Sequence, residues 1–261
     1  MKILVLHGSM RKGNTYSLVK EMISRLQLKS NVTVQEISIA DLNLPFCRSC
    51  HMCLSRGEEF CPDYNIMREI QAALLDCDGV IVSGVTYAWA LNAAMKNVVD
   101  HLAYGFHRPA FFEKKGVVVT TATGVGEKDV AKYLKSVLGQ WGINKAILVT
   151  QNEKEQRLLS SAQLATKLDR ATAKFYRQIS TRQMLPPSIK SIAVHNAFRA
   201  MSLSEFSESE RDRQYWRQKK HNKAYPVKAG MLKYALGAIV FAVSKSMTKW
   251  IGLLYEKRIK R

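Results

Sequence analysis

The sequence predicts an α/β protein with a doubly wound, five-stranded parallel sheet, followed by a helical, basic C-terminal extension. Two observations lead to this fold class. Apolar segments alternate five times with segments of helical periodicity within residues 1–180, and most of the apolar segments are continuous. Strands of that composition are covered on both faces, as in a doubly wound parallel sheet. Hydrophobic residues make up 47% of the chain, a typical share for a globular protein.

The expected strands are short runs rich in Val, Ile and Leu and bounded by turn residues. The second strand alternates apolar and polar residues, whereas each of the others contains an uninterrupted apolar stretch. The strands cover residues 2–7, 32–39, 79–82, 116–121 and 143–149.

Each expected helix follows a strand and repeats apolar side chains at intervals of three and four residues. The helices cover residues 15–26, 65–75, 92–104, 128–140 and 156–179. Ligands of such sheets bind beyond the carboxyl ends of the strands, in the loops that lead into helices. We therefore expect functional residues in the loops that follow residues 7, 82 and 121.

A run of four cysteines interrupts this pattern after the second strand. Cys47, Cys50, Cys53 and Cys61 are spaced C-x2-C-x2-C-x7-C and precede Pro62. Thiolates with this spacing can converge on one iron–sulfur cluster, although disulfides or a zinc site are alternatives. The strand-like N-terminus has no apolar signal core, which disfavours secretion and disulfides. Zinc usually takes two separated ligand pairs. The fifth cysteine, Cys77, stands apart.

The first of the three loops, residues 8–17, combines glycines, hydroxyl and amide side chains and two cations directly before a helix. A helix N-terminus offers unpaired N–H groups and a positive dipole to a phosphate. The loop matches neither G-x-G-x-x-G nor G-x4-G-K-S/T, which favours a phosphomonoester over a dinucleotide or ATP. The alternative is a polar turn in which Asn14 or Thr15 is an ordinary N-cap.

The other two loops carry weaker signals for a planar ligand. Residues 83–89 place Tyr87 and Trp89 just past a buried strand, where aromatic rings can wall a flat ring or simply pack in the core. Residues 120–126 are small and rich in hydroxyls, and Gly124 and Gly126 allow a close approach of the backbone. On its own this stretch is equally an ordinary turn.

Taken together, these motifs resemble the NADPH-dependent FMN reductase family of the flavodoxin-like superfamily. The resemblance rests on residues 8–15, on the stretch from Tyr87 through Ala94-Met-Lys-Asn-Val-Val-Asp-His, and on residues 121–124. The cysteine run resembles the iron–sulfur flavoprotein subgroup of that family. The chain departs from the family pattern at Val85, where Pro is usual, and at Tyr64-Asn65, where Asp-Asp is usual.

The resemblance implies a flavodoxin-like FMN-binding domain over residues 1–183, with a cysteine-rich loop at 45–63. It implies an FMN-dependent oxidoreductase, linked to NAD(P)H or to ferredoxin, that passes electrons between FMN and a [4Fe-4S] cluster. The cluster ligands would be Cys47, Cys50, Cys53 and Cys61. The FMN phosphate would be held by Ser9, Arg11, Asn14, Thr15 and Ser17. The ribityl chain and ring would contact Val85, Thr86, Tyr87, Trp89, Thr123, Gly124 and Gly126.

The flavin supplies the reaction chemistry, so we expect no catalytic side chain, and His7 and His101 are interpreted as structural. In this family flavins lie at a dimer interface, which implies a homodimer or homotetramer, with ferredoxin or a quinone as electron donor or acceptor. Without a cluster, the same fold would predict an NAD(P)H-dependent FMN or quinone reductase. A flavin-binding, membrane-docked interaction module is the alternative outside enzymes. NADH and NADPH both stay open as co-substrates.

Residues 187–261, after Pro186-Pro187, form the predicted extension. The formal net charge is +15 over residues 170–261 and +4 over residues 1–169. A surface this basic indicates an anionic partner, either a membrane or a nucleic acid, or else a tail kept for solubility or for an acidic protein. We expect no nucleic-acid partner, because no recognised motif is present. Residues 204–216 are interpreted as a capped, exposed helix.

The sequence of the last part of the extension predicts an amphipathic helix. The apolar run from Met231 to Val243 is too short to span a membrane. We expect residues 228–261 to lie on the inner face of a membrane, in a cytoplasmic protein, or to pack on a neighbouring subunit. The expected apolar side holds Trp250, Leu253, Leu254 and Tyr255, framed by Lys245, Lys249, Lys257 and Arg258.

Overall fold

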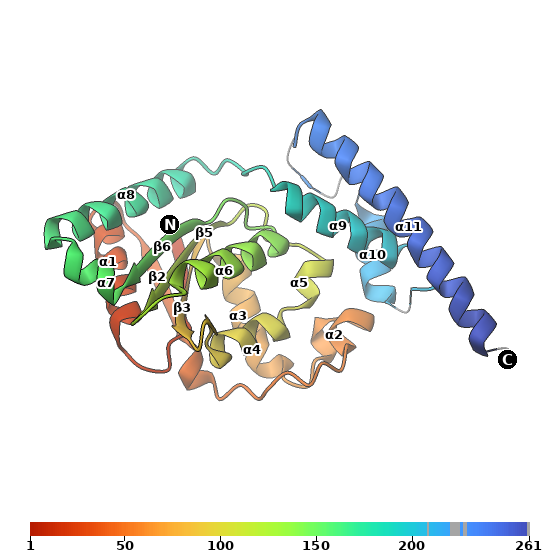
Figure 1. Cartoon of the computed structure of the whole chain (residues 1–261), viewed down its shortest axis with the longest axis horizontal. Coiled ribbons are helices and arrows are strands. Elements are labelled where there is room, and N and C mark those ends of the chain that lie inside the picture. The colour runs from red at the N-terminus through yellow and green to blue at the C-terminus, as the bar shows by residue number, and fades with distance from the viewer. Residues whose placement is uncertain (208, 220–224, 227–228, 260–261) are drawn as a thin grey trace.

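A parallel sheet with the strand order β2-β1-β3-β5-β6 forms the centre of the computed structural model (Figure 1). The structure describes residues 1–207, 209–219, 225–226 and 229–259, with side chains up to residue 254. The short β4 pairs antiparallel with β3. This order confirms the flavodoxin-like, doubly wound fold. The strands are β1 Lys2–His7, β2 Thr33–Ser38, β3 Gly79–Tyr87, β4 Ala90–Leu91, β5 Lys115–Ala122 and β6 Ile147–Asn152.

Helices cover both faces of the sheet. One face is covered by α1 (Asn14–Gln27) and α8 (Ser161–Ser180). The other is covered by α3 (Tyr64–Asp76), α4 (Ala93–His101) and α6 (Glu127–Trp141). The shorter helical segments are η1 Ile39–Leu42, α2 Met52–Ser55, η2 Glu58–Phe60, α5 Tyr104–His107 and α7 Glu153–Leu158.

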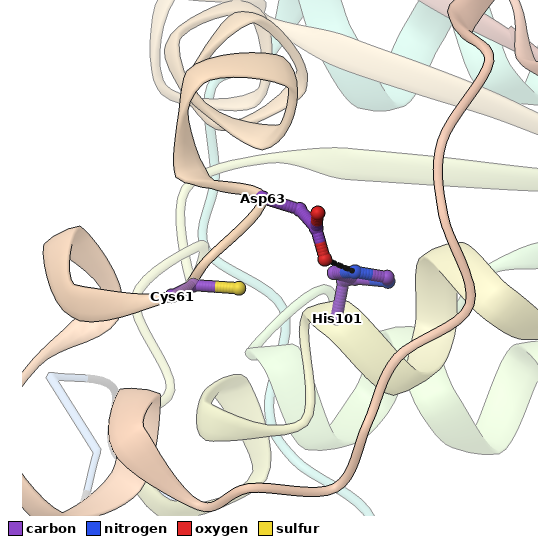
Figure 2. Close-up of side chains that lie close together, drawn as sticks. All are labelled: Cys61, Asp63 and His101. Carbon is purple, nitrogen blue, oxygen red and sulfur yellow. Dashed lines mark hydrogen bonds and ion pairs between the residues drawn. The ribbon is translucent and has the colours of Figure 1, made fainter.

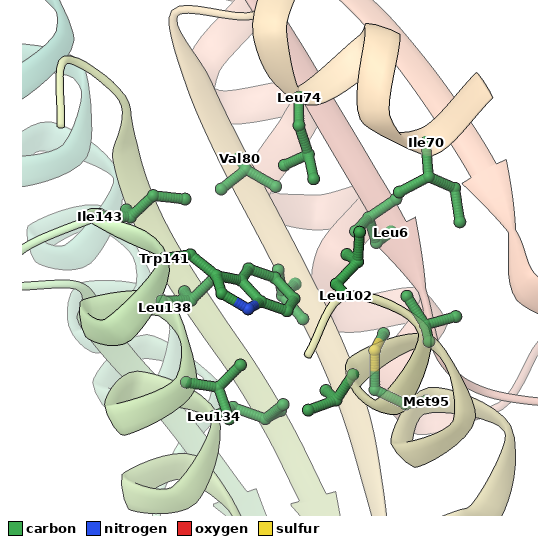
Figure 3. Close-up of a cluster of buried hydrophobic side chains, with 14 of the residues drawn as sticks. Leu6, Ile70, Leu74, Val80, Met95, Leu102, Leu134, Leu138, Trp141 and Ile143 are labelled. Carbon is green, nitrogen blue, oxygen red and sulfur yellow. The ribbon is translucent and has the colours of Figure 1, made fainter. Parts of the chain in front are cut away.

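The two faces of β1 explain why its sequence is apolar at every position from Ile3 to Leu6. Alternate side chains of a strand point to opposite faces. Ile3 and Val5 pack with α1 and α8, and Leu4 and Leu6 pack with α3, α4 and α6. Figure 3 shows the cluster between the sheet and α3, α4 and α6, in which the Trp141 side chain of α6 faces the buried side chains of the sheet and of α4. The sheet is therefore buried on both sides, as its composition predicted.

Four element boundaries differ markedly from the prediction. Strand β3 continues to Tyr87 instead of ending at residue 82, so residues 83–87 of the expected second loop are the end of a strand. The fifth parallel strand begins at Ile147 rather than at residue 143. Helix α6 ends at Trp141 with Gly142, at a φ of 104°, as its C-cap, and Ile143 is buried from the turn that follows. The helix expected at 92–104 is divided into α4 and α5. The helix expected at 156–179 is divided at Ser160, whose side chain caps α8.

The extension forms three helices beside the end of the sheet unit that carries α2 and α5 (Figure 1). These are α9 Ile189–Ser202, α10 Glu210–Gln218 and α11 Met231–Ile259. The first of them was not predicted. The prediction that residues 204–216 form an exposed helix was wrong, because Trp216 and Asp212 of α10 are only 2% and 1% exposed. Both side chains pack into the body of the protein.

Helix α11 is a single 29-residue helix that packs along α9 through small side chains. A Cβ atom on Gly237 would lie 2.8 Å from Asn196 Nδ2, and one on Gly252 would overlap the ring of Phe206. The predicted apolar residues Trp250, Leu253 and Leu254 point outward and are exposed. The predicted roles of Tyr255, Lys257 and Arg258 lie outside the described side chains.

Candidate functional site

Hydrogen bonds tie the three predicted loops together at the carboxyl edge of the sheet. Thr15 Oγ1 of the first loop lies 2.6 Å from Thr121 Oγ1 of the third. Asn92 Nδ2 donates to the Gly8 carbonyl at 2.6 Å, and Asn92 Oδ1 accepts from the Val85 N–H at 3.2 Å. One surface therefore contains residues that are far apart in the sequence. Asn92 was missed because its role depends on partners 84 and 7 residues away.

The first loop leaves the N-terminus of α1 without a side-chain cap. Gly13 is the N-cap residue, so the alternative in which Asn14 or Thr15 caps the helix was wrong. The Ser9 hydroxyl donates to the Arg11 carbonyl at 2.6 Å and so shapes the turn. A 14-residue helix that keeps its first N–H groups unpaired offers the positive end of a dipole to an anion. This geometry fits a phosphate.

Glycine is required where the first loop leaves the sheet. A Cβ atom on Gly8 would lie 2.4 Å from the Ser83 carbonyl oxygen. The Gly8 N–H donates to that same carbonyl at 3.1 Å. The loop thus lies directly against β3, which sets its distance from the second loop.

The second loop holds its aromatic side chains out of the core. Tyr87 and Trp89 are 77% and 78% exposed, and Ala88 and Trp89 adopt left-handed backbone conformations with φ of 47° and 64°. Packing in the core is therefore excluded as their role. The neighbouring Thr86 Oγ1 is buried and has no hydrogen-bond partner among the described residues. An exposed aromatic pair beside an unpartnered hydroxyl fits a flat ligand with polar edges.

The third loop approaches the second closely. A Cβ atom on Gly126, which has a φ of 100°, would lie 3.0 Å from Thr86 Cγ2, so the backbone there needs a glycine. A Cβ atom on Gly124 would meet open space. Thr123 and Gly124 are exposed at this edge of the sheet.

All four clustered cysteines line one cavity of about 150 Å³. The five cysteines of the chain, all of which the structure describes, are free thiols. Two contacts to α4 hold the loop in place. The Cys47 N–H donates to Asn97 Oδ1 at 2.9 Å, and Asn97 Nδ2 donates to the Pro45 carbonyl at 2.8 Å. Cys77 is 3% exposed and packs in the core, apart from this cavity.

His101 also lines the cysteine cavity, one helical turn after Asn97. Figure 2 shows His101 and Asp63 facing each other, with the Cys61 sulfur directed toward the same space. The ligand atoms of these three side chains lie within 4.8 Å of one another. His101 Nε2 lies 3.1 Å from Asp63 Oδ2, and Nδ1 lies 2.9 Å from the Asn97 carbonyl. The structural interpretation of His101 therefore misses its position beside a predicted ligand.

The thiols form a site that suits a cationic group. Burial, with a smaller contribution from Cys61, raises the pKa of the Cys53 thiol to about 11. Burial likewise raises the pKa of Cys61. Four neighbouring thiolates repel one another, and metal ions stabilise the deprotonated form. A cavity lined by four thiols fits an iron–sulfur cluster by the chemistry of its donor set.

The extension contacts the cysteine loop through a buried arginine. The Arg108 guanidinium, 6% exposed, donates to the Cys53 carbonyl at 2.7 Å and to Glu58 Oε2 at 2.9 Å. It also pairs with Asp212 of α10. The Ser209 hydroxyl, at the start of α10, donates to the Leu54 carbonyl. This network, which the sequence did not reveal, joins residues 53–58 to the C-terminal part of the chain.

Comparison with known proteins supplies the family. The model of the NADPH-dependent FMN reductase family matches residues 1–153. The chain belongs to the NADPH-dependent FMN reductase family. This match confirms the resemblance seen in the sequence motifs.

Two curated relatives are iron–sulfur flavoproteins. One, from Archaeoglobus fulgidus, is 33% identical over 146 residues, which are 55% of this chain and 64% of that protein. The other, from Methanocaldococcus jannaschii, is 32% identical over 101 residues, which are 38% of this chain and 51% of that protein. The chain thus spans between half and two thirds of the length of these relatives.

Solved structures of low sequence identity share the fold. The NADH:FMN oxidoreductase EMOB aligns with a TM-score of 0.54 and 20% identity, covering 70% of this chain and 94% of that one. An azoreductase from Bacillus anthracis aligns with a TM-score of 0.56 and 16% identity, covering 68% and 99%. These likenesses support the flavodoxin-like assignment.

Proposed function

We propose that this family member is an FMN-dependent oxidoreductase that passes electrons between FMN and a [4Fe-4S] cluster. The observation that carries the proposal is the cavity lined by all four clustered cysteines in a chain that belongs to an FMN reductase family. Its two relatives named as iron–sulfur flavoproteins support the same assignment. When bound, FMN would supply the exchange between two-electron and one-electron transfer.

The first loop would hold the FMN phosphate. The first N–H groups of α1 would bind the phosphate. The side chains that would join them are in the loop and the first turns of the helix, namely Ser9, Arg11, Asn14 and Ser17. Thr15 would contribute through its backbone, because its hydroxyl is buried against Thr121. Arg11 would add a positive charge that the N-terminal dipole alone does not supply.

The second and third loops would place the flavin ring. Tyr87 and Trp89 would cover one side of the ring, Val85 and Thr86 would contact the ribityl chain, and the unpartnered Thr86 hydroxyl would take a polar group. The backbone at Thr123, Gly124 and Gly126 would lie along the other edge, where N–H groups stabilise negative charge on a reduced ring. The division of the chain into a flavin domain, 1–183, and an extension, 187–261, belongs to this proposal.

Cys47, Cys50, Cys53 and Cys61 would ligate the cluster. Asn97 would hold Cys47 and Arg108 would hold the carbonyl of Cys53, so that two of the ligands are positioned by hydrogen bonds to the backbone. NAD(P)H, ferredoxin or a quinone would be the partner in electron transfer. We also propose a homodimer or homotetramer, because the exposed Tyr87 and Trp89 would then be covered by a second subunit.

The test is the iron, acid-labile sulfide and flavin content of protein purified without oxygen. About four irons and four sulfides per chain are expected beside one FMN. Cys50→Ser should lose iron and keep flavin, whereas Cys77→Ala, at the cysteine outside the cavity, should keep both. Flavin without iron in the unaltered protein would refute the cluster. NAD(P)H-dependent reduction of FMN or a quinone would then become the leading function.

A second proposal concerns the exposed side of α11. Among the described residues no helix is long and apolar enough to cross a membrane. Large apolar side chains of α11 are nevertheless between 43% and 89% exposed, and Lys245 and Lys249 are exposed beside them. We propose that residues 228–261 lie on an anionic membrane surface. The apolar set is Met231, Leu232, Ile239, Val243, Met247, Trp250, Ile251, Leu253 and Leu254.

Vesicle sedimentation tests this contact. The unaltered protein should sediment with vesicles that contain phosphatidylglycerol, and Trp250→Glu with Ile251→Glu should reduce the bound fraction several-fold. Leu28→Glu is the matched control, because Leu28 is 88% exposed on the flavin unit. Equal binding by the double variant would refute the proposal. A dimer that the double variant dissociates would instead assign this surface to a second copy of the chain.

A further inference from the structure

A second basic feature lies away from both predicted sites. A cavity of about 530 Å³ opens between α6, α8 and the first residues of α9 and α11. Six of its fifteen lining residues are lysines, and no Asp or Glu is among them. We call it the lysine cavity. Its lysines are Lys132, Lys135, Lys145, Lys174, Lys190 and Lys233.

Most of these lysines have no anionic partner within the described part of the chain. Lys132 pairs with Asp129 at 3.0 Å, an exposed pair, and Lys233 Nζ donates to the Pro187 carbonyl at 2.8 Å. The other four form no ion pair with a described residue. Like charges gathered on a concave surface raise the local potential and concentrate anions there. This arrangement costs stability unless an anion offsets it.

The inner surface of the lysine cavity adds groups that suit a phosphate. Helix α9, 14 residues long, begins here, and Ser188 caps it by accepting from the Ser191 N–H at 3.0 Å. The other N–H groups of the first turn contribute the positive end of the helix dipole. Gln140 and Asn144 also line the cavity and are 2% and 4% exposed. Their side-chain oxygens lack a donor among the described residues, and as acceptors they suit a hydroxyl group or a water molecule beside the phosphates rather than the phosphate oxygens. The groups that attract a phosphate are thus the lysines and the N-terminus of α9.

The position of the lysine cavity separates it from the flavin loops. Asn144, Lys145 and Ala146 directly precede the first residue of β6, whereas the flavin loops lie at or after the last residues of β1, β3 and β5. In a parallel sheet the first and the last residues of the strands lie at opposite ends of the sheet. The cysteine cavity shares no lining residue with the lysine cavity. A ligand bound here would therefore touch neither redox site.

We propose that the lysine cavity binds an anion that carries two or more phosphate groups. Its volume is within the range of cavities that hold small ligands, and six lysines can offset several negative charges. The phosphates could belong to a free polyphosphate or to the headgroup of an anionic lipid. Because both the start of α9 and Lys233 of α11 line the cavity, binding would fasten the extension to the flavin unit.

The experiment uses the full-length, FMN-loaded protein, so that the flavin phosphate loop is not available to the probe. Inorganic tripolyphosphate is titrated by calorimetry, and the thermal unfolding temperature is measured with and without it. The test variant combines Lys145→Gln and Lys190→Gln. The matched control combines Lys29→Gln and Lys154→Gln, two exposed lysines outside the cavity. A parallel series replaces tripolyphosphate with phosphatidylcholine vesicles that contain phosphatidate.

Tripolyphosphate should bind and raise the unfolding temperature, since a ligand of the folded state stabilises it. The test variant should bind at least tenfold more weakly, and the control should stay within twofold. Without the probe, the test variant should unfold at the same temperature as the unaltered protein or higher at low salt, because repulsion is relieved. This result would separate lost binding from lost folding.

The outcomes distinguish the two sources of phosphate. Tripolyphosphate binding that the test variant weakens supports a soluble ligand. Binding to phosphatidate vesicles alone, weakened in the same variant, supports a lipid headgroup. The proposal is overturned if neither probe binds, or if test and control variants lose affinity equally. Tripolyphosphate binding that persists unchanged in the test variant would also overturn it, whereas vesicle binding that persists there is assigned to the exposed side of α11.

Discussion

Asp212→Asn tests how the extension supports the cysteine loop. The Asp212 carboxylate is 1% exposed and pairs with Arg108, and its Oδ2 atom lies 2.8 Å from His107 Nδ1. The change keeps the shape of the side chain and removes its charge. The Arg108 guanidinium then remains buried beside a neutral amide.

The expected cost follows from the remaining partners of Arg108. Removing one member of a buried ion pair costs about 3–5 kcal/mol, because the other charge is left uncompensated. Arg108 keeps Glu58 at 2.9 Å and the Cys53 carbonyl at 2.7 Å. We therefore expect the lower end of that range, about 3 kcal/mol off the free energy of unfolding.

Urea unfolding, followed by tryptophan fluorescence, measures this loss. Glu210→Gln is the matched control on the same helix, because its side chain is 54% exposed and pairs only with Arg213 at 3.1 Å among the ion pairs of the described residues. It should cost less than about 0.5 kcal/mol. A second readout is alkylation of Cys53 in protein freed of iron. The reaction should be faster in Asp212→Asn than in Glu210→Gln, since Arg108 anchors the backbone of Cys53.

A stability loss below about 1 kcal/mol, or one equal to that of Glu210→Gln, would refute the assignment of a buried ion pair. A full loss of stability with unchanged alkylation would show that the network supports the extension and not the loop.

Three further predictions concern other parts of the molecule. Burial lowers the pKa of His195 to about 4, so as the pH falls the unfolded chain takes up the proton before the folded protein does. The free energy of unfolding should therefore keep the full contribution of His195 above pH 6.5 and lose roughly 3 kcal/mol toward pH 4. Urea unfolding at several pH values measures this loss, and His195→Gln should lack it. Gly8→Ala should lower the free energy of unfolding by about 1–3 kcal/mol, because the added Cβ would lie 2.4 Å from the Ser83 carbonyl oxygen, and it should weaken FMN binding in a fluorescence titration. Gly124→Ala is the control and should not alter stability, because its Cβ would lie in open space. Asn97→Ala should lower iron content and cost about 1–3 kcal/mol, since the Cys47 N–H loses its acceptor; unchanged iron would contradict this.

The sheet could be predicted because the amino-acid composition of each strand is enough to show that the strand is buried. Val80, Ile81 and Val82 are all buried, so an uninterrupted apolar run and its position between two helix patterns were sufficient. Ile143 is separated from the apolar run at 146–149 by Asn144 and Lys145, and it is buried from a turn and does not begin a strand. The composition of a segment indicates that it is buried, but the left-handed backbone conformation of Gly142 determines where α6 ends.

The extension was predicted poorly because its buried faces are polar. Ser191, His195, Asn196 and Arg199 all face inward on α9, so no apolar periodicity marks this helix. Asp212 on α10 is compensated by Arg108, a residue 104 positions earlier. A pattern read within one segment cannot identify such a pair. The exposed helix predicted at 204–216 failed for this reason.

The loops were located correctly by the rule for parallel sheets, whereas the residues that hold them were not. Thr15, Tyr87 and Gly126 lie at the carboxyl edge, as expected from strand order. Asn92, Asn97 and Arg108 hold loops through backbone atoms, so nothing in those loops marks their partners. The assignment of FMN and cluster ligands stays a prediction until the cofactor content is measured.

The contact between Ser209 and the Leu54 carbonyl has a consequence for the order of events during synthesis. Ser209 is made 155 residues after Leu54. Chains fold from the N-terminus as they leave the ribosome, so the sheet can assemble while the segment around Leu54 still lacks its final contacts. Under the proposed function, the surroundings of the cluster would be complete only after α10 has been made. A ribosome-stalled chain that ends at residue 208, before α10 and its cap, would already contain every cysteine, together with Asn97 and Arg108, but neither Ser209 nor Asp212.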